Sequence, residues 1–343
     1  MNNEIDLKNY NIRTDLVVDL YNDDLTDNNI KIVKNKINDI EITDIDILDD
    51  KNNLNKKKGK YITISFKDVT DKKNKKDLET ILIKYLKEML ESLNLDFNKK
   101  ALIVGLGNID STPDALGPKT IKNILVTKYL FEMDEVEPSP NYRNVSTFVP
   151  GVLATTGMES SDMIKGIIKE SNPDFLIVID ALASSSIDRI NKTIQMTDSG
   201  INPGSGIGNN RKEISKQVLN IPVISIGIPT VIDAIVLVSD TIKYLYKHFS
   251  YNKDNYNKNK LIPITKRNYA SYDKDLTMEE KENLLGQVGL LTEEETKELI
   301  FEVLTPINYN MMVTPKEIDF LIDQLSEVLS YSINCSLHKK FDI

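Results

Sequence analysis

Three short apolar runs in the middle of the chain each end at a turn-forming or acidic residue. They are residues 101–107, 175–180 and 222–229, and residues 193–196 form a candidate fourth. Each run is too short for a buried helix, whereas strands buried on both faces of a sheet have such continuous apolar sequences. We therefore predict that these segments are strands of one central sheet.

Helical periodicity separates and flanks these runs. Four stretches repeat apolar residues every three or four positions: 77–95, 118–130, 158–170 and 231–248. Thr292 with Glu295, and Thr314 with Glu317, have capping-box spacing, which predicts two further helix starts. Strands that alternate with helices indicate an α/β fold with a mostly parallel sheet covered on both faces. In such sheets the ligand site lies beyond the carboxyl ends of the strands.

Glycine and proline are concentrated in the same part of the chain. Eleven of the 14 glycines and nine of the 12 prolines lie between residues 101 and 245. Because these residues allow tight turns and close approach of the backbone to a ligand, we expect the functional site there. Lys/Asn-rich stretches at 51–60, 71–76 and 252–260 predict solvated loops, and we expect mobile loops near 50–60 and 249–275.

The charge and cysteine content exclude several classes of protein. A net charge of −9 argues against a nucleic-acid binder that neutralises phosphates. A single cysteine excludes an internal disulfide and a Cys-rich metal site, and two histidines leave little for His-based catalysis. No apolar run approaches the ~20 residues that span a bilayer, and the first 15 residues do not form a secretory signal. We expect a cytoplasmic protein with no membrane or direct nucleic-acid partner.

Two aspartates follow the predicted strands. Asp114 lies in the loop GLGNIDSTPDALGP (105–118), and Asp180 ends the run at 175–180. Two carboxylates close together cannot both ionise easily, so one activates water while the other donates a proton. The alternative is that each aspartate only caps a helix or fixes a loop.

A third loop, residues 197–212, is rich in small residues: Gly200, Gly204, Ser205, Gly206 and Gly208. Its backbone N–H groups suit a carbonyl or an anion, so we predict a substrate-binding loop. Asp198-Ser199-Gly200 looks like the Asp-Thr/Ser-Gly signature of pepsin-type proteases. That fold needs two such motifs in an all-β framework, so we do not assign Asp198 a catalytic role.

These segments together resemble the germination protease family of spore-forming bacteria, also called GPR endopeptidases or spore proteases. The likeness is carried by GLGN…TPDALGP, FVPGVLATTGMES (148–160) and VIDALAS…TIQMTDSGINPGSGIGNNRK, and it runs essentially end to end. The resemblance implies an atypical aspartic endopeptidase that degrades small acid-soluble spore proteins during germination, in the forespore and spore core. It also implies a homotetrameric zymogen, a three-layer α/β/α fold like that of hydrogenase-maturation proteases, no cofactor, and catalytic roles for Asp114 and Asp180.

The N-terminal segment matches the sequence that this family cuts. The resemblance implies cleavage after an acid in a Thr-Glu-apolar context, and Thr14, Asp15 and Leu16 fit that pattern, whereas Val17 and Val18 depart from the small residues that follow. We therefore expect a propeptide of residues 1–15 and a single catalytic domain over 16–343. The alternatives are a loose N-terminal strand here and, for the whole chain, a metal-dependent maturation peptidase, a nucleoside phosphorylase or an inactive binding module.

Overall fold

The computed structural model describes residues 14–21, 27–133, 140–205, 211–259, 269, 272–304 and 311–339. The chain divides into two compact units. The larger contains residues 13–184, 188–231 and 314–343, and the smaller is built mainly from residues 232–313. The single domain expected over residues 16–343 therefore comprises two units of unequal size.

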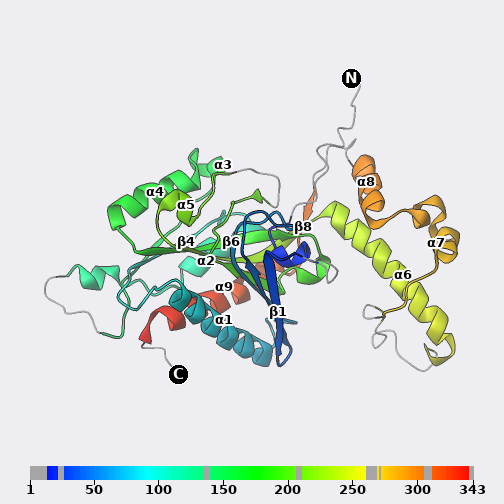
Figure 1. Ribbon diagram of the computed structural model, residues 1–343, viewed down its shortest axis with the longest axis horizontal. Helices are drawn as coiled ribbons and strands as arrows, with labels where there is room; N and C mark the ends of the chain where they lie inside the picture. The colour runs from blue at the N-terminus through cyan, green and yellow to red at the C-terminus, as the bar shows by residue number, and fades with distance from the viewer. Residues whose placement is uncertain are drawn as a thin grey trace, which may run out of the picture. The chain divides into compact units, whose positions relative to one another are not determined.

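A mixed sheet organises the larger unit (Figure 1). Its strands are β1 (Ile30–Ile37), β2 (Ile40–Ile47), β3 (Gly59–Ser65), β4 (Ala101–Gly105), β5 (Val145–Phe148), β6 (Phe175–Ser184), β7 (Thr193–Thr197) and β8 (Val223–Asp233). Their order across the sheet is β1-β2-β3-β7-β8-β6-β4-β5. The α/β class is confirmed, and the four predicted strands are β4, β6, β7 and β8.

The parallel pairing is confined to one part of the sheet. β4 pairs in parallel with both β5 and β6, whereas β1, β2, β3, β7 and β8 pair antiparallel in succession. A mostly parallel sheet was expected from the sequence because β1–β3 lack the continuous apolar runs of the central strands. Their polar and apolar residues alternate, and β1 and β2 are joined by a tight turn in which Asn38 has a φ of 55°.

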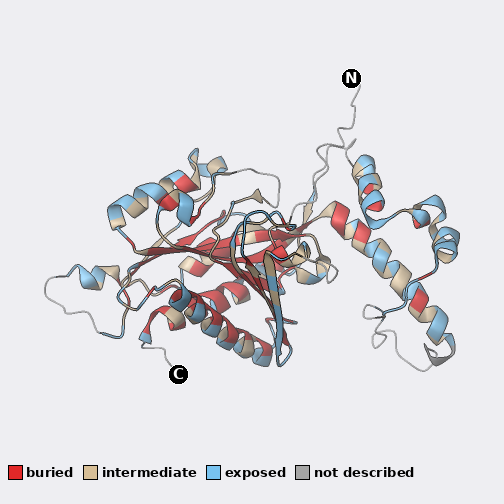
Figure 2. Ribbon diagram, viewed as in Figure 1, coloured by how far each residue is buried: buried red, intermediate tan, exposed pale blue. Residues whose placement is uncertain are grey.

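Helices cover both faces of this sheet, as Figures 1 and 2 show. Alternate residues of β4 and β6 point to opposite sides: Ile103 and Ile177 pack with α1 (Lys72–Ser92) and α9 (Ile318–Leu337). Leu102 and Val178 pack in a second core with α4 (Ser160–Ser171) and α5 (Lys216–Leu219). The α/β/α layering is thus present around the parallel strands.

Two predicted helices need correction at their bounds. α1 begins at Lys72, within a stretch predicted as a loop, because the Asp71 side chain accepts a hydrogen bond from the Asn74 N–H at 2.8 Å. The helix predicted over 118–130 is shortened to α2 (Leu116–Ile121) and a 3-10 turn, η4 (Lys128–Phe131). Between them the Thr127 N–H bonds to the Val145 carbonyl instead.

The Thr314 capping box is also wrong. α9 begins at Ile318, and the Thr314 hydroxyl donates to the Thr230 carbonyl at 2.8 Å. The box at Thr292 and Glu295 is confirmed at the start of α8 (Glu293–Leu304), where each backbone N–H bonds to the other side chain. None of the helices in the described ranges is long and apolar enough to cross a membrane.

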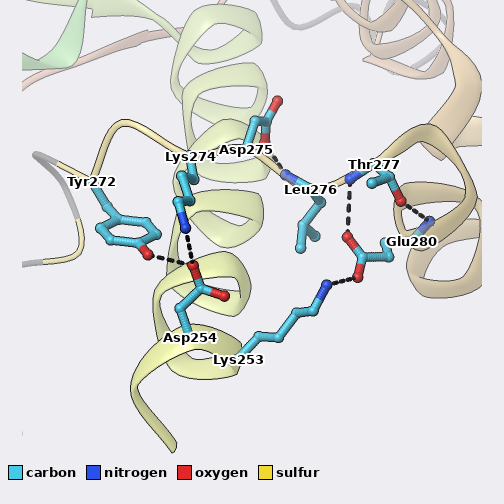
Figure 3. Close-up of polar contacts among 8 residues, drawn as sticks. All are labelled: Lys253, Asp254, Tyr272, Lys274, Asp275, Leu276, Thr277 and Glu280. Atoms are coloured by element: carbon cyan, nitrogen blue, oxygen red, sulfur yellow. Dashed lines mark hydrogen bonds and ion pairs between the residues drawn. The ribbon is translucent and has the colours of Figure 1, made fainter.

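The smaller unit is helical. It contains α6 (Ala234–Asn259), α7 (Met278–Leu285), η8 (Gly286–Leu290), α8, and the short strand β9 (Met312–Val313), which pairs with the end of β8. α6 extends through residues 249–259, where we predicted a loop, with a kink at Asn255 (φ −117°). Polar contacts offset the weak helix propensity of this stretch: Lys253 pairs with Glu280 of α7, and Asp254 binds Tyr272 and Lys274 (Figure 3).

The second predicted mobile loop, near residues 50–60, has a defined hydrogen-bond pattern. The Asn52 side chain donates to the carbonyls of Asp49 and Lys56, and the Lys58 N–H donates to Asp50. Leu54 is buried among side chains of β2 and β3. Its mobility stays a prediction.

Candidate active site

Asp114 is placed by a tight strand-to-helix connection. It ends the 3-10 turn η3 (Thr112–Asp114), and its Oδ2 accepts a hydrogen bond from the Asn108 N–H at 2.8 Å. Gly107 has a φ of +110°, and a Cβ there would lie 2.0 Å from the Asp114 carbonyl oxygen. Only glycine allows the backbone after β4 to pass this close to Asp114.

Asp180 lies one residue beyond the point where β6 pairs with the end of β4. Ile179 is in register with Gly105, and the Leu106 N–H donates to the Ile179 carbonyl at 2.8 Å. The Asp180 side chain is 5% exposed, and its Oδ1 accepts from the Ala181 N–H. Asp114, just beyond the carboxyl end of β4, and Asp180 of the adjacent parallel strand β6 are therefore near each other, as the sequence predicted. Asp180 lies inside β6, which continues to Ser184, and not at its carboxyl end as predicted.

Burial makes both carboxyl groups hard to ionise. It raises the pKa of Asp114 to about 6. The pKa of Asp180 is raised well above its usual range, first by burial and then by the negative charges of Asp114 and Asp15. The second effect shows that three carboxylates share this region. Such coupled groups hold a proton at neutral pH.

The raised pKa of Asp114 predicts a gain in stability on substitution. Above about pH 6 the folded chain carries a charge that burial disfavours, whereas the unfolded side chain ionises near 3.8. Stability from protonated Asp114 is therefore complete below pH 3.8 and lost as the pH rises to about 6. Asp114→Asn should increase the free energy of unfolding by about 1–3 kcal/mol at pH 7.5 and by little at pH 4.

Denaturant unfolding at the two pH values measures this difference. Asp162→Asn is the control, because Asp162 is exposed and its pKa is lowered by the Lys212 hydrogen bond. That variant should show no gain at pH 7.5. A destabilised Asp114→Asn at pH 7.5 would contradict the prediction.

Asp15 lies beside the end of β6. Its backbone N–H donates to the Ala183 carbonyl at 3.1 Å, and its Oδ2 accepts from the Ala183 N–H at 2.9 Å. Its Oδ1 accepts from the Ser205 hydroxyl at 2.6 Å. The sequence predicted a role for Asp15 but no partner for its carboxylate. The Ala183 N–H and the Ser205 hydroxyl are two such partners.

The residues after Asp15 are part of the folded unit. Leu16 and Val17 are both 0% exposed, and Val17 packs with Ile45, Leu54 and Tyr61. Thr14 and Asp15 are only partly buried. The change from partial to full burial thus falls at the Asp15–Leu16 bond.

Two side chains that the sequence analysis did not identify contact this junction. Gln195 Nε2 donates to the Asp15 carbonyl oxygen at 3.2 Å, and Lys56 Nζ lies 3.4 Å from the same oxygen. Gln195 is inside β7 and Lys56 is in the Lys/Asn-rich loop. No sequence motif marks either residue, because they reach the junction only through the order of the strands in the sheet.

The glycine-rich loop is only partly described. Gly206 and Gly208 lie outside the described residues. Ser205 contacts Asp15, whereas Gly204 and Gly200 have positive φ values of 71° and 91°. Gly200 packs against the backbone of Ile214, so it shapes the loop.

The remaining candidates have structural partners. The Asp198 carboxylate accepts a hydrogen bond from the Lys60 N–H at 2.7 Å at the start of β3. His338 is buried against Arg143, and His248 lies on α6 of the smaller unit. Within the described ranges, no group of three His, Cys, Asp or Glu side chains is arranged to hold a metal ion.

Comparison with known proteins gives a consistent family. A family model described as "Germination protease" matches residues 12–343. The chain is 42% identical to the germination protease of Priestia megaterium, with 100% of this chain and 98% of the relative covered. It is 42% identical to that of Bacillus subtilis, with coverage of 98% and 96%.

A comparison with solved structures gives a weaker likeness. A [NiFe] hydrogenase maturation protease from Thermococcus kodakarensis aligns with a TM-score of 0.28 and 17% identity. The alignment covers 43% of this chain and 80% of the other.

Proposed function

The chain belongs to the germination protease family, and on this premise we propose that it is a self-activating aspartic endopeptidase. In this proposal it is made as a zymogen and cuts its own chain between Asp15 and Leu16. The mature enzyme then degrades small acid-soluble spore proteins in the spore core during germination, and it cuts after an acidic residue.

Asp114 and Asp180 divide the chemistry between them. Asp180 is the more deeply buried of the two, and the charges of Asp114 and Asp15 also raise its pKa, so we assign the proton to Asp180 and the role of ionised base to Asp114. Asp114 takes a proton from water, whose oxygen bonds to the carbonyl carbon. Asp180 gives its proton to the leaving nitrogen as the C–N bond breaks. The products are a new carboxyl group and a new amine.

The observation that carries the proposal is the position of the Asp15–Leu16 junction. Asp15 pairs with Ala183 on the same strand that carries Asp180, and the Asp15 charge raises the pKa of Asp180. A family cleavage sequence therefore lies near Asp180, one of the two aspartates that the family resemblance selects. A loose N-terminal strand would have no reason to occupy this place.

The contacts of the Asp15 side chain explain a preference for acids. The Ala183 N–H and the Ser205 hydroxyl both donate to its carboxylate. Charge-assisted hydrogen bonds of this kind stabilise by about 1.5–3 kcal/mol each. An amide or apolar side chain would lose one or both of them.

One experiment tests the proposed function directly. The purified full chain is incubated at mildly acidic pH, and its mass and N-terminal residue are followed with time. It is then mixed with a small acid-soluble spore protein that contains Thr-Glu-Ile-Ala-Ser, with and without EDTA. We expect a new N-terminus at Leu16, cleavage after the glutamate, and no effect of EDTA. Loss of activity with EDTA would favour the metal-dependent maturation peptidase instead.

The predicted homotetramer is also part of the proposal. Val238, Leu245 and Phe249 are exposed and lie on one face of α6, where they suit contact with another apolar surface. We expect a species of about 156 kDa, four times the 38.9 kDa of the chain.

Leu245→Glu with Phe249→Glu should lower that mass, because two charges would be buried at the interface. Light scattering at micromolar concentration measures it. Lys247→Glu on the same helix is the control, since it changes charge without removing an apolar side chain. A wild-type mass near 39 kDa, or a double variant that stays at the wild-type mass, would contradict the placement of the interface on this helix.

A further inference from the structure

We propose that Lys56 and Gln195 bind the carbonyl oxygen of the bond that is cut and stabilise the negative charge that develops on it. The inference rests on the proposed function, because it takes the Asp15–Leu16 bond as a substrate of the site. It assigns a task that Asp114 and Asp180 leave open.

Gln195 holds the chain on both sides of Leu16. Its Nε2 donates to the Asp15 carbonyl oxygen at 3.2 Å, and its Oε1 accepts from the Val17 N–H at 2.7 Å. One side-chain amide thus bonds two backbone groups that flank the junction, as a neighbouring strand would. Gln195 is 6% exposed and lies in β7, between β3 and β8, so its position is fixed by the sheet.

Lys56 brings a positive charge to the same oxygen. Its Nζ lies 3.4 Å from the Asp15 carbonyl oxygen and 3.2 Å from that of Thr14. The loop that carries it is held by Asn52, which accepts from the Lys56 N–H and donates to the Lys56 carbonyl. Leu54 of this loop packs in the same cluster as Val17. The loop that carries Lys56 and the chain after the junction are therefore anchored in the same apolar cluster.

The surroundings of Lys56 strengthen its effect. Burial lowers the pKa of Lys56, and the carboxylates of Asp15 and Asp19 oppose that lowering. At mildly acidic pH the side chain is an ammonium group in a partly desolvated place. Electrostatic interactions are stronger there than in water.

The chemistry needs such a group. When the water oxygen bonds to the carbonyl carbon, the C=O π electrons move to the oxygen, which becomes negative. Lys56 Nζ and Gln195 Nε2 are the donors that already contact this oxygen. When the C–N bond breaks, the C=O bond reforms and the donors return to their starting state. Neither residue gains or loses a proton overall.

Self-cleavage of the full chain tests this role, because the bond and the site belong to one molecule and the first-order rate reports the chemical step. The variants are Lys56→Met, Gln195→Leu and Gln195→Glu. Glutamate keeps an acceptor for the Val17 N–H but has no donor for the Asp15 carbonyl. Removal of one such donor typically slows catalysis by about 10²–10³-fold, and we expect this for all three variants. Thermal unfolding checks that all three variants are folded, and the Gln195→Leu variant should melt a few degrees lower because the buried Val17 N–H loses its acceptor.

Matched controls separate this effect from general damage. Lys58→Met changes an exposed lysine of the same loop, and Gln217→Leu changes an exposed glutamine of α5. Both should cut at the wild-type rate.

Chemical rescue then tests the charge itself. Lys56→Cys is treated with 2-bromoethylamine, which forms a thioether carrying an amine at nearly the length of lysine, or with iodoacetamide, which gives a neutral side chain. The only other cysteine, Cys335, is buried. We expect the amine to restore the rate and the amide to leave it low.

The possible outcomes distinguish failure of this inference from failure of the proposed function. If the wild type cuts after Asp15 and the Lys56 and Gln195 variants cut as fast as the controls, this inference fails while the proposed function stands. Slow variants without recovery by the amine would make Lys56 a structural anchor and overturn its role. If the wild-type chain never cuts after Asp15, the proposed self-cleavage fails, and the inference fails with it.

Discussion

Asp180→Asn is expected to leave the chain folded, uncut at Asp15–Leu16 and inactive on added peptides. Asp114→Asn should do the same. The loss of general acid or base catalysis should be about 10²–10⁴-fold or more for each variant. The physical reason is that an amide neither accepts a proton from water nor donates one to the leaving nitrogen. Intact mass over days for self-cleavage, and a Thr-Glu-Ile-Ala-Ser peptide for activity, measure the two losses.

The double variant adds a sharper criterion. If the two carboxyl groups act as a pair, removing the second after the first should cost little more activity, because the step that needs both is already lost. Independent roles would give multiplied losses. Denaturant unfolding checks that each variant is folded. Asp114→Asn is expected to be more stable than the wild type at pH 7.5.

Asp198→Asn is the matched control for this pair. Burial also raises the pKa of Asp198, but its carboxylate is bound to the Lys60 N–H beside β3 and away from the carboxyl ends of β4 and β6. A raised pKa alone is therefore not enough to identify a catalytic group. If Asp198→Asn abolished cleavage and Asp114→Asn kept most of it, the assignment of the site would be wrong.

The parallel half of the sheet was predictable because its sequence signal is local. β4 is a continuous apolar run that ends at the turn carrying Asp114, and β6 begins with the apolar run that leads into Asp180. Strands with this sequence, separated by helices, place their carboxyl ends together. Spacing along the chain was therefore enough to pair two residues 66 positions apart in sequence.

The antiparallel half was not predictable by the same means. β1 is almost wholly exposed and β2 carries Asp44 and Asp46, so neither resembles a buried strand. β3 places the loop with Lys56 near the junction through its pairing with β7, a contact between segments more than 100 residues apart. Lys56 and Gln195 could not be predicted from sequence for this reason: only long-range strand pairing brings both side chains to the Asp15 carbonyl oxygen.

Capping signals illustrate how tertiary contacts override local ones. Thr292 and Glu295 form the predicted box at an exposed helix start, where nothing competes for their side chains. Thr314 and Glu317 have the same spacing, but the Thr314 hydroxyl is bound by the Thr230 carbonyl of β8. The box at Thr277 and Glu280, at the start of α7, was not predicted because the residues before it have the polar composition of a loop.

Asp15→Ala is expected to give a folded chain that stays uncut and inactive. The substitution removes the acceptor for both the Ala183 N–H and the Ser205 hydroxyl, and two charge-assisted bonds of about 1.5–3 kcal/mol each correspond to a loss of about 10²–10⁴-fold. Asp15→Asn separates charge from shape, and it should also be cut slowly. Asp15→Glu keeps the carboxylate and matches the acid of the family cleavage sequence, so it should be cut.

A chain that begins at Leu16 should then be active at once. Leu16 and Val17 are fully buried, so the folded unit keeps its first apolar anchors when residues 1–15 are absent. Thr14 and Asp15 contribute mainly polar contacts, and their loss would leave the Ala183 N–H, Ser205, Gln195 and Lys56 facing an empty place beside Asp180. The acidic residue of a substrate can make these contacts through its own side chain and carbonyl group. The order of activity on a Thr-Glu-Ile-Ala-Ser peptide should therefore be the Leu16 chain above the freshly purified full chain, with Asp15→Ala lowest. A folded but inert Leu16 chain, beside a full chain that cleaves the peptide, would show that residues 1–15 complete the site, and the zymogen proposal would be wrong.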